Sequence, residues 1–426
     1  MKLHTTYWIA VIILWISSLG ALVYDNRYWI LYPHQFLSYQ AYPHAHLYAL
    51  GGGIFIGSDV SVVDDTMITQ SLDSEGNNEN ADLFSIFGQY DQVVINNALQ
   101  KAGRTSASLL PPQFDQLNSI PWSTPGKTSL RGCVLAVEGY IHEYCGFGAS
   151  WFVGKMHANE ASILCNSQRY ASGDINALHM ANMEMRTALE TVPSCYEAAV
   201  FGDIDLYTRG RITVDYWCKM HHLDIGLRVG GLLPSGIGTL WYNPASLPVG
   251  GNGHWGLYVQ SDGNFLLNDL LSAGYALQVI HRFSRTSIQR MPVLTEPTNF
   301  GALVAPARIS PGITVVFNPY VQVGGLRGGL GCVGAYYLVH HAPDRWCVSD
   351  LIAEQFDPNL ALLRERSAWG RDHFSVTLFY DFGYERACSY SAPIVSLTID
   401  IPWSGGPVTR MVNKSHALSL RIETRI

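Results

Sequence analysis

Six charged residues in one stretch of the sequence have the spacing needed to act together chemically. Four are cationic and two are anionic: Arg209, Arg211, Asp215, Lys219, Asp224 and Arg228. Cationic side chains gathered on one surface attract anions, whereas carboxylates among them form ion pairs. The set therefore predicts either a surface that favours anionic solutes or a group of ion pairs that stiffens the protein.

The stretch 205–234 positions these residues through a two-residue period. Between residues 206 and 220, the even positions are mostly apolar and the odd positions are mostly polar or charged. Because side chains alternate between the two faces of a β-strand, this period predicts a strand with one apolar and one charged face. The alternation resumes after His221 and His222, which we interpret as a tight turn. The stretch therefore predicts a long antiparallel hairpin.

The length of the hairpin indicates what surrounds it. Each arm has about ten to fifteen residues, whereas strands of soluble domains usually have about five or six. A tilted strand that crosses a bilayer needs about nine to eleven residues, with apolar side chains toward lipid and polar ones toward a lumen. A lysine or arginine that faces lipid at the bilayer centre costs about 2 to 4 kcal/mol. We therefore predict a transmembrane β-barrel in which the six charged residues line the pore.

The composition of the chain agrees with a barrel. Of the 426 residues, 14% are charged, 12% are aromatic and 40 are glycine, whereas about 25% of the residues of a soluble protein are charged. The net charge of −7 and the absence of a basic run give no sign of a nucleic-acid partner. The eight cysteines include no Cys-x-x-Cys pair, so we expect neither a zinc site nor another cofactor.

The chain divides into three predicted segments. Residues 1–21 hold one lysine, an apolar run and small residues, which predicts a cleaved signal peptide, with an uncleaved anchor as the alternative. Residues 22–127 predict a helical or irregular segment that plugs or caps the pore, with a short helix over 91–103 and a strand candidate at 47–57. Residues 128–426 predict an antiparallel barrel of about twelve strands, within a range of about ten to sixteen.

Other signals locate elements within the barrel region. A second hairpin is predicted over 128–154, with a bulge near Leu135. The run Ser, Asp, Gly and Asn at 261–264 predicts a turn. Residues 344–371 predict a polar, partly helical loop. Further strands are predicted over 374–382, 395–401 and 416–426, so the chain ends on an amphipathic strand.

A signal-like N-terminus, long two-sided hairpins with aromatic residues near their ends and an amphipathic last strand together resemble bacterial outer-membrane β-barrel proteins. The resemblance is architectural, covers roughly residues 128–426 and singles out no particular family. It implies a location in the bacterial outer membrane, with the lipid bilayer and the outer-membrane assembly machinery as partners. Many such proteins end in phenylalanine, whereas this chain ends in Ile426.

The predicted function is porin-like: passive diffusion of small solutes with a mild preference for anions. One alternative is a non-conducting surface barrel for adhesion or envelope structure, and another is a secreted soluble β-sandwich protein. The sequence does not define the oligomeric state.

We predict no enzymatic activity. Although His373, Ser375 and Asp381 share one face of a strand, residues two apart on a strand lie about 6 to 7 Å from each other, which does not provide a nucleophile–base pair. The histidine pairs 221–222 and 340–341 are predicted in turns rather than at a metal, because adjacent strand residues point to opposite faces.

Overall fold

The structure is a computed structural model of the chain. It describes residues 49–62, 122–123, 126–142, 144–160, 163–164, 195–215, 221–236, 238–243, 246, 248–293, 301–326, 328–383, 393–402 and 413–425, with a few single positions between 175 and 190. In this part of the chain, no helix has both the length and the apolar character needed to span a membrane.

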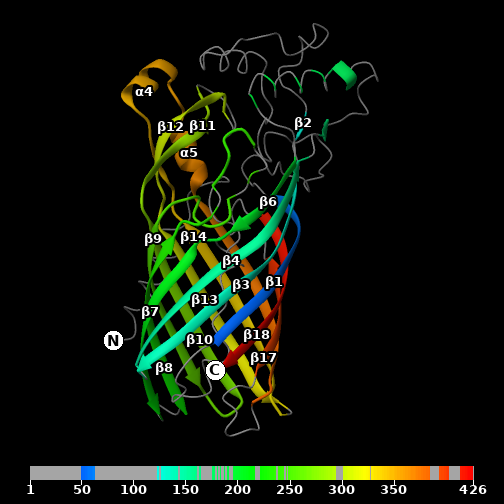
Figure 1. The fold of residues 1–426 in the computed structure, drawn as a ribbon, viewed down its shortest axis with the longest axis vertical. Helices are drawn as coiled ribbons and strands as arrows, with labels where there is room; N and C mark the ends of the chain where they lie inside the picture. The colour runs from blue at the N-terminus through cyan, green and yellow to red at the C-terminus, as the bar shows by residue number, and fades with distance from the viewer. Residues whose placement is uncertain are drawn as a thin grey trace, which may run out of the picture.

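Twelve strands in the described part of the chain pair as an antiparallel ring (Figure 1). In order around the ring they are β1 (Ala49–Val62), β3 (Gly126–His142), β4 (Cys145–Glu160), β7 (Ile204–Asp215), β8 (His222–Leu233), β9 (Gly256–Leu266), β10 (Leu271–Arg282), β13 (Thr314–Leu326), β14 (Leu330–His341), β16 (Trp369–Asp381), β17 (Ile394–Pro402) and β18 (Asn413–Arg425). Each strand pairs with the next, and β1 pairs with both β18 and β3, so the sheet closes on itself. Closure pairs the strand edges, as a sheet surrounded by lipid requires.

The remaining described elements lie outside this ring. Strand β6 (Cys195–Phe201) continues the line of β7 along β4, because β4 pairs first with β7 and then with β6. A separate sheet contains β11 (Arg285–Met291), β12 (Leu303–Ser310) and β15 (Arg345–Cys347). The other elements are the short pair β2 (Trp122–Ser123) and β5 (Ile163–Leu164), and the helices α4 (Asp350–Phe356) and α5 (Leu360–Ser367).

The two ends of the barrel differ in their connections. At one end, neighbouring strands are joined by segments as short as 143–144 and 327–329, and β1 begins and β18 ends there. At the other end, the connections are as long as 63–125, and the sheet of β11, β12 and β15 stands there with α4 and α5 (Figure 1). In bacterial outer-membrane barrels the short turns face the periplasm and the long loops face outward.

The outer face of the ring is apolar. Its large apolar side chains recur at every second position and are exposed, among them Leu206, Ile212 and Val214 of β7, Ile225, Leu227 and Val229 of β8, Phe374, Val376 and Leu378 of β16, and Leu418, Leu420 and Ile422 of β18. In water such a surface would be unfavourable by about 25 cal/mol for each Å² of apolar area. The wall is therefore built to contact lipid.

The structure confirms the fold class and most of the predicted strands. The central hairpin is β7–β8, and the second hairpin is β3–β4. The three C-terminal segments are β16, β17 and β18, and the partly helical loop over 344–371 contains α4 and α5.

Several details of the prediction are wrong. Strand β1 belongs to the wall, so the barrel does not begin at residue 128. The ladder of the central hairpin ends at the pair Asp215 and His222, so His222 opens a strand rather than forming a tight turn. The register of β3–β4 shifts near Tyr140, not near Leu135. Residues 261–264 continue β9 instead of turning, because Asp262 and Asn264 face the polar interior. The predicted signal peptide and the helix over 91–103 lie outside the described residues.

Candidate functional site

The register of the sheet arranges the inward side chains in rows across the wall. One row runs through Glu138, Gly148, Tyr207, Gly230 and Tyr258, each directly opposite the next on five adjoining strands. The next two rows toward the short connections contain Arg209, Arg228 and Gln260, and then Arg211, Gly226 and Asp262. The register of the strands therefore determines which of these side chains lie next to one another.

Tyr207 ties together three adjacent strands. Its ring lies across Gly148, where an added Cβ would meet the ring at 2.2 Å. Its hydroxyl donates a hydrogen bond of 2.8 Å to Oε2 of Glu138, on the strand beyond. Because Gly148 on the middle strand has no side chain, the ring of Tyr207 can extend across it to the carboxylate of Glu138, two strands away.

The same arrangement recurs further around the wall. The ring of Tyr258 lies across Gly230, and its hydroxyl donates a 2.8 Å hydrogen bond to Oδ1 of Asp205. A third example consists of Tyr320, Gly274 and Asn264, with a longer hydrogen bond of 3.4 Å. The inner wall thus repeats one unit, in which a tyrosine, a glycine and a polar acceptor lie on three adjacent strands.

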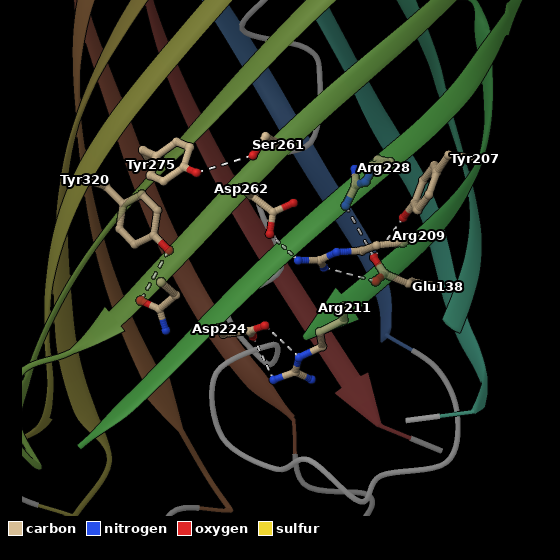
Figure 2. A network of polar contacts seen from close by, with 11 residues as sticks. Glu138, Tyr207, Arg209, Arg211, Asp224, Arg228, Ser261, Asp262, Tyr275 and Tyr320 are labelled. Carbon is tan, nitrogen blue, oxygen red and sulfur yellow. Dashed lines mark hydrogen bonds and ion pairs between the residues drawn. The ribbon is translucent and has the colours of Figure 1, made fainter. Parts of the chain in front are cut away.

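Arg209 is the centre of the charged network (Figure 2). Its Nη2 donates to Oδ2 of Asp262, and its Nη1 lies 3.5 Å from Oε1 of Glu138. On the neighbouring strand, Nη2 of Arg228 lies 3.7 Å from Oε2 of Glu138, and its guanidinium lies 4.0 Å from the centre of the Tyr207 ring. Only 4% of the Arg209 side chain is exposed. The four polar groups and the aromatic ring therefore form one packed cluster.

A second ion pair lies closer to the short connections (Figure 2). Nε of Arg211 donates to Oδ1 of Asp224 at 2.9 Å, and its Nη2 lies 2.7 Å from Oδ2. This bidentate geometry is the strong form of an arginine–carboxylate pair. Gly226 leaves room for the neighbouring pair, since a Cβ there would lie 2.6 Å from Oδ2 of Asp262.

The charges of the ion-paired network are balanced. Three guanidinium groups and three carboxylates pair with one another in it: Arg209, Arg211, Arg228, Glu138, Asp224 and Asp262. A fourth carboxylate, Asp205, accepts the hydrogen bond of Tyr258. The sequence analysis weighed four cations against two anions because it did not include three of these carboxylates. The described charges therefore give no excess of positive potential.

An apolar layer lies on the side of the long connections. It contains Tyr207, Leu232, Tyr258, Ile280, Val339 and Trp369, with Val316 packed against it. The six buried side chains and the partly buried Val316 come from seven consecutive strands of the ring. A hydrated ion next to such a layer loses water contacts without gaining polar ones.

The predicted site residues have different placements. Arg209, Arg211 and Asp224 are buried in the polar network, and the Arg228 side chain is 14% exposed. Asp215 is the last residue of β7, and Lys219 lies outside the described residues. The structure thus brings four of the six residues into one network. That they line a conducting pore stays a prediction.

Sequence reasoning missed the partners that complete the network. Glu138 was inside a predicted strand without being singled out, and Asp262 was read as part of a turn. Glycines that face tyrosines across a strand pair were the available signal, but this signal requires knowing the register. A single sequence does not reveal how strands that are distant in the chain pair with each other.

The other residues that the sequence analysis considered for catalysis or metal binding do not form a common site among the described residues. His373 and Ser375 are buried on the inner face of β16, whereas Asp381 is at the far end of that strand. His340 and His341 lie within β14, so the prediction of a turn there is wrong. His341 contacts Thr314 and Asp344 through its two ring nitrogens, at 2.7 and 3.0 Å. In the described part of the chain, no three histidine, cysteine or acidic residues are grouped as a metal site.

Comparisons with known proteins find likeness only among solved structures. No family model and no curated protein matches the chain. An outer-membrane channel from Pseudomonas putida F1 aligns with 92% of this chain and 100% of its own, at 9% identity and a TM-score of 0.49. The transport unit of the autotransporter AIDA-I from Escherichia coli aligns over 98% and 96%, at 7% identity and a TM-score of 0.36. The toluene transporter TbuX from Ralstonia pickettii aligns over 89% and 90%, at 10% identity and a TM-score of 0.33.

The construction of the wall defines the class of this protein. One closed antiparallel sheet carries exposed apolar side chains outside and buried polar ones inside. A soluble β-sandwich would instead bury its apolar faces between two sheets, so that alternative is excluded. The chain is a transmembrane β-barrel.

Proposed function

We propose that this barrel is a narrow channel through which small solutes of little or no net charge diffuse across the outer membrane. The observation that carries the proposal is the charge-balanced network on the inner wall, where each arginine faces a carboxylate. A lumen with balanced charges favours neither cations nor anions. This replaces the mild anion preference expected from the sequence.

Two further features support a narrow lumen that selects against ions. The polar side chains of the network are buried, so they leave little space around themselves. The apolar layer next to them disfavours hydrated ions, because a dry constriction removes their water without replacing it. Small uncharged solutes lose less on entering such a lumen.

The test is transport by the purified protein in a bilayer. Proteoliposomes are placed in a neutral pentose or in a carboxylate of similar size, and their swelling is recorded. Planar bilayers give the permeability ratio of potassium to chloride. We expect faster swelling with the pentose and a permeability ratio close to unity.

A variant makes this test specific to the network. Arg209→Gln removes the cation between Glu138 and Asp262, so the lumen gains net negative charge and the permeability ratio shifts several-fold toward potassium. Lys155→Gln is the matched control, because Lys155 pairs with Glu197 on the exposed surface. A chloride preference in the unaltered protein would contradict the proposal. Absence of conductance and swelling in all three proteins would favour the non-conducting surface barrel.

A further inference from the structure

Two exposed aromatic side chains mark the rim of the barrel at the end with the long connections. Trp255 precedes β9 and Phe283 follows β10, and their side chains are 57% and 46% exposed. The Phe283 N–H donates to the Trp255 carbonyl at 2.8 Å, so the two residues are neighbours. Exposed aromatic residues at the edge of an apolar wall are typical of the depth at which lipid headgroups begin.

Arg285 lies directly beyond this pair. It is exposed, and its Nη1 donates to the Gly253 carbonyl at 3.1 Å. Its guanidinium also crosses Gly253 closely, since a Cβ there would lie 1.6 Å from Nη1. Gly253 is two residues before Trp255 in the chain. The positive charge is therefore held beside the aromatic rim.

Arg308 reaches the same place from β12. Its Nε and Nη2 both donate to Oγ of Ser284, at 3.2 and 2.9 Å. Ser284 directly follows Phe283, so this guanidinium is also fixed next to the rim. Each of the two exposed arginines thus bonds to a residue within two positions of this aromatic pair in the chain.

The positive charge of both arginines is uncompensated in the described part of the chain. The contacts of Arg285 and Arg308 are made to a carbonyl and a hydroxyl, which are neutral acceptors. Neither residue is among the arginines that form ion pairs in the described part of the chain, which include Arg209, Arg211, Arg228 and Arg282. A guanidinium retains further N–H donors in such a geometry, and these match the oxygens of a phosphate.

We propose that Arg285 and Arg308 bind the phosphate of a lipid headgroup in the leaflet that surrounds this rim, with Trp255 and Phe283 against the upper part of its acyl chains. The position of the two arginines at the rim and their positive charge together support this assignment. The arginines lie just beyond the apolar wall, where a basic side chain near a membrane surface contributes about 1 kcal/mol toward an anionic lipid. The proposal requires only that the barrel spans a membrane, and it does not depend on conduction.

The test measures lipid retention by the full-length protein in a neutral detergent. Native mass spectrometry counts bound phosphatidic acid, and diacylglycerol with the same acyl chains serves as the phosphate-free probe. We expect the unaltered protein to retain phosphatidic acid in preference to diacylglycerol. Affinity for phosphatidic acid should fall about fivefold for Arg285→Gln or Arg308→Gln and roughly 30-fold for the double variant.

Arg345→Gln is the matched control, because Arg345 is an exposed arginine of β15 in the same sheet. We expect it to change the affinity less than twofold, and heat-dependent gel mobility verifies that each variant is folded. Equal binding by the double variant and the unaltered protein, or an equal loss in Arg345→Gln, would overturn the proposal. Complete displacement of phosphatidic acid by millimolar inorganic phosphate would also overturn it, since the site would then bind free phosphate.

Discussion

The two faces of the β7–β8 hairpin adapt the same 12-residue strands to opposite surroundings. On the outer face, the side chain of Leu227 points away from the protein, and Leu227 is 52% exposed. On the inner face, Asp224 is 2% exposed and forms a bidentate pair with Arg211. The outer face is therefore stabilised by its solvent, lipid, whereas the inner face is stabilised by specific partners.

This difference predicts that the two faces tolerate different changes. An apolar side chain facing lipid can be replaced by another apolar one at low cost, because it has no single partner. A buried ionic side chain has defined partners, so its removal leaves a charge behind. The following three variants test this contrast, from the largest expected effect to the smallest.

The largest effect is expected from Asp224→Ala. It removes both carboxylate contacts of the buried Arg211, and we expect a loss of about 3 to 5 kcal/mol in the free energy of unfolding. Urea unfolding of the protein in lipid vesicles, followed by tryptophan fluorescence, measures the change. The double variant Arg211→Met with Asp224→Leu should recover at least half of the loss, because no buried charge remains. If the double variant were less stable than Asp224→Ala, the ion pair would be a net source of stability.

A smaller effect is expected from Leu227→Arg. This change places a guanidinium on the lipid side near the middle of β8, at a cost of about 2 to 4 kcal/mol that falls toward the lower figure if the side chain reaches the interface. The adjacent Arg228 provides an internal comparison, since the wall accepts arginine there on the inner face. Leu227→Ala is the control and should lose less than about 1 kcal/mol. Equal stability of the two variants would show that Leu227 does not face lipid.

The smallest effect is expected from Gly230→Ala. Its Cβ would lie 2.4 Å from the ring of Tyr258, which is held by its hydrogen bond to Asp205. We expect a loss of about 1 to 3 kcal/mol. Gly231→Ala is the matched control, because its nearest neighbour would be at an ordinary 3.8 Å and its effect should stay within about 0.5 kcal/mol. A loss that is the same at both positions would mean that backbone propensity, not the tyrosine, is responsible.

The sequence predicted the wall better than the network. Alternation is a local signal, so it identified the strands around Arg209 and Arg211 and assigned these residues to the inner face. It failed at Asp262 because aspartate, glycine and asparagine in succession are typical of turns in water. Inside a polar lumen, Asp262 and Asn264 are ordinary strand residues that face inward.

The partners of the charged residues could not be predicted for a different reason. Glu138 is 71 residues away from Arg209 in the chain, and Asp262 is 53 residues away. The registers of four successive strand pairs, from β3 to β9, bring these three residues together. A two-residue period determines which face a side chain occupies, but it leaves its position along the neighbouring strand undefined.

The tyrosine–glycine pairs fit only one register in the folded barrel. A slip of two residues between β8 and β9 would keep every side chain on its proper face, so hydrophobic patterning does not oppose it. However, Tyr258 would then lie opposite Arg228 or Leu232 instead of Gly230, and its ring would collide with a side chain. The relative shift of the strands determines the tilt and diameter of a barrel. Glycines that carry no side chain into the lumen thus set how wide that lumen is.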